Sequence, residues 1–153
     1  MALSEPKFVE GRPMLLTGIR QVHAFSDMQL GIPQQWETFN AARAGLTQKS
    51  PVTYGVSCGV SPAGIEYMCA FEVESFDEAP AEFGRLRVEN QKYAVFTHTG
   101  HISSIGQEFN QIVYEWLPNS GFQSAHKPDF EKYDERYDAA TGNGEVEIWI
   151  SIA

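Results

Sequence analysis

Hydrophobic and polar residues alternate without interruption along residues 145–152, at the C-terminal end of the chain. One face of the predicted strand carries Val146, Ile148, Ile150 and Ile152. Since successive side chains of a strand point to opposite faces, this β-branched face should pack on a hydrophobic core. The opposite face carries Glu145, Glu147, Trp149 and Ser151. A large ring between carboxylates on one side and a small hydroxyl on the other indicates a partly dry cleft that binds a positive group; the alternative is an edge strand with solvated glutamates and a shielded tryptophan.

The same patterns predict five earlier strands, in residues 12–23 with a bulge at Gly18, 52–56, 66–73, 93–97 ended by Gly100, and 130–133. Residues 1–11 are polar and are expected to be frayed or extended, and residues 74–86 form an acidic crossover connection. In the strand 66–73, the residues of the core face are Tyr67, Cys69, Phe71 and Val73.

Two stretches have the spacing of amphipathic helices. The first begins with Pro33 in its first turn, buries Ile32, Trp36 and Phe39, and ends at Gly45. The second opens with a capping box between Ser104 and Gln107 and stops at Pro118. Its apolar stripe consists of Ile105, Phe109, Ile112, Val113 and Trp116.

The order strand, helix, strand, strand therefore occurs twice, in residues 12–73 and again in residues 91–153. Ile32 corresponds to Ile105 at an offset of 73 residues (105 − 32). Two further pairs, Tyr54 with Tyr133 and Met68 with Glu147, have an offset of 79 (133 − 54 and 147 − 68). We therefore expect an α+β fold made of one domain, residues 1–153, in which a tandem pseudo-two-fold repeat surrounds a central ligand groove.

Composition narrows the classes of function. With 11 basic and 20 acidic residues the net charge is −9, which disfavours nucleic-acid binding and favours attraction of cations. No run approaches the roughly 18 apolar residues of a membrane span, and the N-terminus lacks the apolar core of a signal peptide. A cytoplasmic protein is expected. Neither the two cysteines nor His98 and His101 have the spacing of a metal site, and no cofactor or catalytic signature is found. Residues 129–138 are interpreted as a solvated charged face.

Four segments in order resemble the GyrI-like family of bacterial effector-binding domains: residues 92–100, 116–122, 130–133 and 147–150. Residues 67–73 followed by 76–80 are similar to the end of that family's first half. Where the family usually has proline after its terminal strand motif, this chain has Ser151. The resemblance implies a tandem repeat around a groove that binds small molecules, and many members are the sensors of multidrug-responsive transcription activators. Their pockets bind lipophilic cations with aromatic side chains and one carboxylate, whose position matches Glu147.

The expected ligand is accordingly a small lipophilic cation, bound by a module without a DNA-binding segment of its own. The predicted ligand-binding residues are Glu147, Trp149, Tyr54, Met68, Tyr133 and Trp36. Glu147 would await a counter-charge from the ligand, and Trp149 would offer cation–π contact. Core packing is the alternative for both tyrosines and for Trp36.

Two other functions stay open at this stage, both suggested by relatives in the family. One is hydrolysis of electrophilic cyclopropane-type compounds, with Glu147 orienting water. The other is inhibition of a protein partner, as in gyrase-inhibitory members.

Overall fold

In the computed structural model, which describes residues 3–153, the chain forms two compact units. One unit is Pro13–Glu89; the other combines Asn90–Ala153 with the N-terminal segment up to Arg12. We call them the first unit and the second unit. Each is an antiparallel sheet with helical segments against it, so the expected α+β class is confirmed. No helix in the described residues is long and apolar enough to cross a bilayer.

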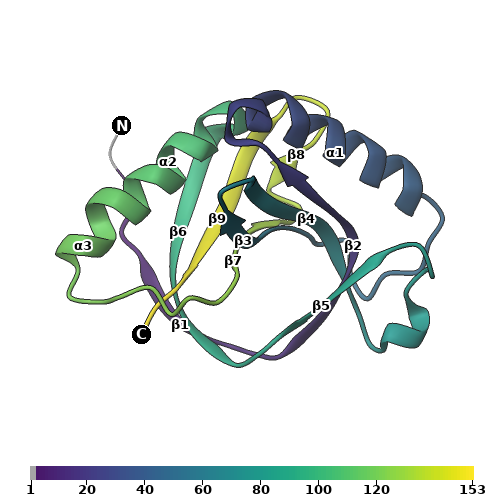
Figure 1. The fold of residues 1–153 in the computed structure, drawn as a ribbon, viewed down its shortest axis with the longest axis horizontal. Helices are drawn as coiled ribbons and strands as arrows, with labels where there is room; N and C mark the ends of the chain where they lie inside the picture. Colours follow the sequence, from purple (N-terminus) through teal and green to yellow (C-terminus); the bar gives the residue numbers. More distant parts are fainter. Residues whose placement is uncertain (1–2) are drawn as a thin grey trace. The chain divides into compact units, whose positions relative to one another are not determined.

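The first unit has four antiparallel strands in the order β3-β4-β2-β5. Its elements are β2 (Met14–His23), η1 (Phe25–Asp27), α1 (Met28–Arg43), β3 (Thr53–Ser61), β4 (Gly64–Val73), η2 (Phe76–Glu78) and β5 (Gly84–Val88). Helix α1 packs on β2 and β4, as Figure 1 shows. Its core contains Phe39 of α1 and the predicted β4 face, Tyr67, Cys69, Phe71 and Val73, which is thereby confirmed.

The second unit has strand order β1-β6-β9-β7, with β8 also paired to β9. Its elements are β1 (Lys7–Gly11), β6 (Gln91–His101), η3 (Ile102–Ser104), α2 (Ile105–Gln111), the π-helical turn η4 (Ile112–Trp116), α3 (Leu117–Asn119), β7 (Asp129–Tyr133), β8 (Tyr137–Asp138) and β9 (Asn143–Ser151). The side chains of Ile112 and Leu117 pack on Ala94 and Phe96 of β6 and on the aliphatic face of β9.

The structure corrects several predicted boundaries. Residues 7–11 form strand β1 on the edge of β6, while residues 1 and 2 lie outside the described part of the chain. Helix α1 begins five residues before Pro33, which is inside the helix and not in its first turn. Strand β6 continues through Gly100, because glycine accepts the backbone φ of 112° found there. The predicted capping box between Ser104 and Gln107 is also wrong. Ser104 makes no side-chain cap, and its hydroxyl donates instead to the carbonyl of His101.

A buried polar hydrogen bond ties the helix to the preceding strand in each unit. In the first unit, Nε2 of His23 lies 2.6 Å from Oε1 of Gln35, whose amide also donates to the carbonyls of Ile19 and Tyr67. In the second unit, Nδ1 of His98 is hydrogen-bonded to Oε1 of Glu108. Gln35 and Glu108 are separated by 108 − 35 = 73 residues, the same offset that relates the two helix stripes.

Gly18 lies in an unbroken register between β2 and β4, so the expected bulge at this position is wrong. The glycine is needed for close strand approach, because a Cβ at Gly18 would lie 1.8 Å from the carbonyl oxygen of Cys69. The irregularity in this unit is in β3, where the register shifts between Ser57 and Gly59.

We expect Gly18→Ala to lower the free energy of unfolding by about 2 kcal/mol or more, because backbone atoms must move to admit the methyl group. Gly59→Ala is the matched control, since a Cβ there meets nothing within 4 Å. Urea unfolding followed by circular dichroism measures both variants. Equal stability of the two would contradict the close approach at Gly18.

Candidate ligand-binding site on strand β9

Strand β9 has an aliphatic face and, opposite to it, a face that carries the polar and aromatic side chains of Glu147 and Trp149. Ile148 and Ile150 are at most 1% exposed and belong to the core of the second unit, as predicted. Glu147 and Trp149 project from the other face, where their partners in β6 are Thr97 and Val95. The alternation read from the sequence is therefore confirmed by the strand pairing.

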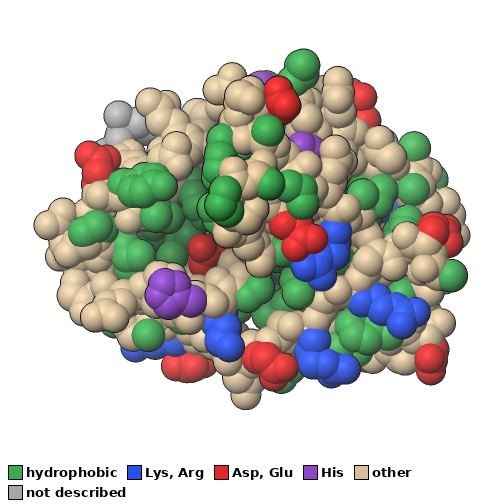
Figure 2. All heavy atoms as spheres, in the orientation of Figure 1, with side chains coloured by type: hydrophobic (Ala, Val, Ile, Leu, Met, Phe, Trp, Pro, Cys, Tyr) green, Lys and Arg blue, Asp and Glu red, His purple; other side chains and the backbone are tan. Residues whose placement is uncertain are grey.

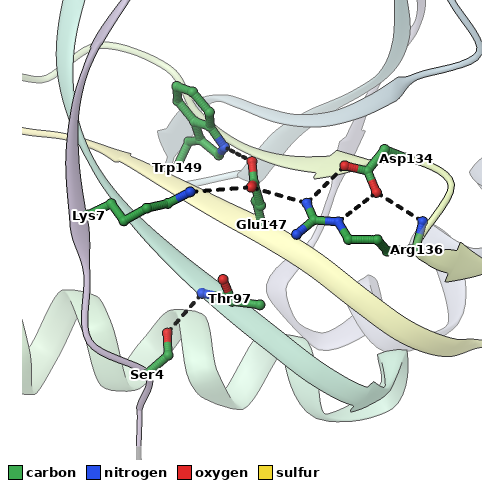
Figure 3. A network of polar contacts seen from close by, with 7 residues as sticks. All are labelled: Ser4, Lys7, Thr97, Asp134, Arg136, Glu147 and Trp149. Carbon is green, nitrogen blue, oxygen red and sulfur yellow. Dashed lines mark hydrogen bonds and ion pairs between the residues drawn. The ribbon is translucent and has the colours of Figure 1, made fainter.

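Glu147 is only 8% exposed and has several polar partners within the second unit (Figure 3). The indole Nε1 of Trp149 donates to its Oε1 at 3.0 Å. Its Oε2 lies 3.1 Å from Nη2 of Arg136 and 3.9 Å from Nζ of Lys7. The expectation that Glu147 awaits an external counter-charge is therefore wrong, because the chain itself supplies two cations.

Arg136 connects two carboxylates in the segment between β7 and β8. Its Nε and Nη2 donate to Asp134 at 3.0 and 2.8 Å, in a two-point contact. These bonds lower the pKa of Asp134, and together with Glu147 they raise the pKa of Arg136. The prediction of a simple solvated face over residues 129–138 is wrong here, since Arg136 reaches the Glu147 carboxylate of β9.

Trp149 lies in an aromatic cluster on the same face. Its ring stacks on Phe130 of β7 at 5.2 Å between centroids and meets Tyr93 of β6 edge-on at 5.3 Å. Lys132 places its ammonium 5.8 Å from the centre of the indole. Burial, with the nearby Asp129, raises the pKa of Tyr93 to about 12, so its hydroxyl stays neutral. The cluster combines apolar area with a ring face that attracts cations.

Asp129 connects β7 to the end of β9. The backbone N–H of Ser151 donates to its Oδ1 at 2.8 Å, a bond that proline at this position could not make. Burial raises the pKa of Asp129, although the bonds from Ser151 oppose that shift. Ser151 thus gives this chain a tie between β9 and β7 beside the aromatic cluster.

The remaining predicted site residues fall on different surfaces. Tyr54 faces Ala70 across β3 and β4, and Met68 faces Val56, so both belong to one buried face of the first unit. Trp36 lies on the other side of that sheet, where it packs on the core and donates its indole N–H to Tyr67 at 3.2 Å. Tyr54 and Met68 are thus brought together, and Trp36 is not brought to them.

Tyr133 is not the residue that the strand register matches with Tyr54. Tyr54 pairs with Ala70 in the first unit, and the residue that corresponds to Ala70 at the offset of 79 is Trp149. The β7 partner of Trp149 is Phe130. With the 79-residue offset applied to β4 and β9, these registers match Tyr54 with Phe130, so the Tyr54–Tyr133 equivalence stays a prediction; Tyr133 donates its hydroxyl to Glu131 at 2.8 Å.

Sequence reasoning missed Phe130, Lys132, Arg136 and Asp134 as members of this site. The alternation of β7 could have placed Phe130 and Lys132 on the face of Trp149. No local pattern indicates Arg136, because its contact with Glu147 depends on how the chain turns between β7 and β9.

Metal and nucleic-acid sites receive no support from the geometry. The described residues contain no group of three or more His, Cys, Asp or Glu side chains arranged to hold a metal ion. Basic and acidic side chains are interspersed on the face drawn in Figure 2, so this face is not a basic surface of the kind that binds nucleic acids.

The two aspartates should give opposite pH dependences of stability. The folded state holds the proton of Asp129 more tightly than the unfolded chain does, because the pKa of Asp129 is raised in the fold. The contribution of Asp129 to the free energy of unfolding is therefore full below the ordinary aspartate pKa of about 3.9, and it is lost as pH rises through the raised folded pKa. The contribution of Asp134 is present above about 3.9 and is lost as pH falls through its lowered pKa.

Urea unfolding over a pH series, compared with Asp129→Asn and Asp134→Asn, measures each contribution as wild type minus variant. The difference should fall with rising pH for Asp129 and rise with pH for Asp134. Slopes of the same sign would contradict the environments described for these carboxylates.

Comparison with known proteins agrees with this architecture. The model of the GyrI-like small molecule binding domain matches residues 4–153. Transcriptional regulator BrlR of Pseudomonas aeruginosa is 34% identical over 125 residues, which are 79% of this chain and 46% of the regulator. The chain thus spans about half the length of that relative.

Two solved structures illustrate the range of proteins that share the fold. SAV2435 bound to tetraphenylphosphonium superposes with a TM-score of 0.78 at 19% identity, covering 98% of this chain and 94% of that one. A hydrolase encoded by lin2189 from Listeria innocua superposes with a TM-score of 0.58 at 9% identity, covering 97% and 92%. The match of the family model along nearly the whole sequence shows that the chain belongs to the family of GyrI-like small molecule binding domains.

Proposed function

We propose that this protein binds lipophilic organic cations through the face of β9 that carries Glu147 and Trp149, as the effector-binding part of a regulatory system. The observation that carries the proposal is Glu147, a carboxylate 8% exposed that accepts the indole N–H of Trp149 in an otherwise aromatic cluster. The family binds small molecules, and SAV2435, a structural neighbour, is bound to an aromatic phosphonium.

The chemistry of the face suits such a ligand better than a neutral or anionic one. A bulky aromatic cation has a diffuse charge that is weakly hydrated, so its transfer to a partly buried surface costs less than that of a compact ion. Trp149 and Phe130 offer apolar area and a negative ring face, and Glu147 offers a fixed charge of opposite sign. The net charge of −9 adds long-range attraction for cations.

We infer further that the two units are repeats of one strand-helix-strand-strand pattern. Both have this order of elements, and both join strand to helix through a buried histidine and a Gln or Glu at the 73-residue offset. In this correspondence Met68 matches Glu147 and Ala70 matches Trp149. Tyr54 and Met68 stay predicted ligand contacts of the first unit, and the pseudo-two-fold groove stays a prediction of the family resemblance.

Two ions of matched shape test the charge preference directly. Tetraphenylphosphonium and tetraphenylborate are nearly isosteric and carry opposite charges, so isothermal titration with each isolates the role of charge. The wild type should bind the phosphonium more tightly, and Glu147→Gln should weaken that binding by on the order of tenfold or more, about 1.4 kcal/mol. Equal affinities for both ions in the wild type would refute a cation site.

The two tryptophans of the second unit should separate binding from stability. Trp149→Ala should weaken phosphonium binding by about 1–3 kcal/mol, because wall area and cation–π contact are lost together. Trp116→Ala should lower the free energy of unfolding by roughly 3–5 kcal/mol and affect binding less, since Trp116 packs edge-on against Phe96 of the core at 5.0 Å. If Trp149→Ala unfolds the protein while Trp116→Ala spares it, the assignment of the two faces is wrong.

A further inference from the structure

Both features of the β9 face that attract a cation are already in contact with cations of the chain. Nη2 of Arg136 lies 3.1 Å from the Glu147 carboxylate, and the ammonium of Lys132 lies 5.8 Å from the centre of the Trp149 ring. A ligand cation that uses Glu147 must therefore compete with Arg136.

Arg136 has a second partner that would remain after such competition. Its Nε and Nη2 both donate to Asp134, and its backbone N–H donates to the same carboxylate at 3.0 Å. The backbone is also fixed, because the carbonyl of Arg136 accepts from the N–H of Glu145 at 3.1 Å. A small rotation of the guanidinium would therefore be enough for Arg136 to leave Glu147. The positive charge of the guanidinium would stay paired with Asp134 throughout.

Lys7 is a weaker competitor for the same carboxylate. Its ammonium is 3.9 Å from Oε2 of Glu147, and its side chain is 67% exposed. An exposed, loosely placed ammonium contributes little, because it stays hydrated and its flexible chain loses entropy when held. Arg136, with a side chain 33% exposed and a hydrogen-bonded geometry, is the principal resident cation.

We propose that Arg136 determines ligand specificity: it is the resident counter-ion of Glu147, and a cationic ligand binds by displacing it onto Asp134. The inference rests on the proposed function. Because Arg136 already balances much of the charge of Glu147, electrostatic attraction alone gives a ligand only a small net advantage. Only a cation that also buries apolar area on Trp149 and Phe130 gains free energy over the resident guanidinium. The exchange thus selects large aromatic cations and rejects small hydrated ones.

Substitution of Arg136 should consequently improve binding. In Arg136→Gln the free protein holds Glu147 without its main counter-charge, so a bound cation relieves a larger electrostatic penalty. We expect tetraphenylphosphonium to bind about tenfold more tightly, and tetramethylammonium, which the wild type should reject, to show measurable binding. Arg87→Gln is the matched control: it removes one positive charge from an exposed position, where the guanidinium lies over the ring of Phe76.

Asp134 supplies an independent arm of the test. Asp134→Asn removes the carboxylate that receives the displaced guanidinium, so Arg136 should stay on Glu147 and phosphonium affinity should fall severalfold. In the double variant with Arg136→Gln, this loss should disappear, because Asp134 acts only through Arg136. Lys7→Gln should change affinity less than Arg136→Gln does.

The outcomes distinguish the two proposals. Failure of both wild type and Arg136→Gln to bind the phosphonium overturns the proposed function. If the wild type binds and folded Arg136→Gln binds equally or more weakly, only the role of Arg136 is overturned. Should Arg136→Gln fail to fold, Asp134→Asn decides: reduced affinity supports the exchange, and unchanged or increased affinity overturns it.

Discussion

The burial of one face of β9 is the constraint on which the candidate site depends. Ile148 and Ile150 pack beneath the helical segments of the second unit, and their burial sets the register of β9 against β6. Since side chains alternate along a strand, this register places Glu147 and Trp149 on the other face without any further interaction. A slip by one residue would bury the carboxylate in the aliphatic core, which is why the position of Glu147 is well determined.

A carboxylate that is only 8% exposed still needs compensation, and the chain provides it from both neighbouring directions. Lys7 reaches Glu147 from β1, on the far side of β6, and Arg136 reaches it from the segment after β7 (Figure 3). The free protein is thereby balanced in charge at its most buried acidic group on this face. In the exchange proposed above, such a site discriminates among cations by what each adds beyond its charge, and apolar contact with Trp149 is the available addition.

The fold alone does not decide among the activities of its relatives. SAV2435 bound to a phosphonium and the hydrolase of Listeria innocua share this architecture with the chain. Function is carried by the side chains placed on the scaffold. Here these are an aromatic cluster, one indole-bonded carboxylate and an arginine paired with it, the set on which the proposal of a cation site rests.

Local patterns were sufficient to predict much of the second unit's core and of the first unit's sheet. The alternation in β4 and β9 identified both core faces, because periodicity depends only on neighbouring residues. Helical spacing likewise predicted that Phe39 of α1 and Ile112 of the second helical segment would pack in the cores of their units. Boundaries were less accurate: β1 and β5 are edge strands that have no strong pattern of their own and depend on β6 and β2 for pairing.

What only the tertiary structure decided is which distant side chains meet. The pairing of Phe130 with Trp149 depends on the register of β7 against β9. This register cannot be predicted from the sequence, because the chain between the two strands does not fix which residues lie opposite each other. The counter-ions of Glu147 were likewise unpredictable, because Arg136 and Lys7 reach it through a turn and an edge strand. The sequence by itself determined that β9 has one hydrophobic face and one that carries Glu147 and Trp149. The tertiary structure determined that this carboxylate is already paired, since ion pairs depend on distances in space and not on spacing along the chain.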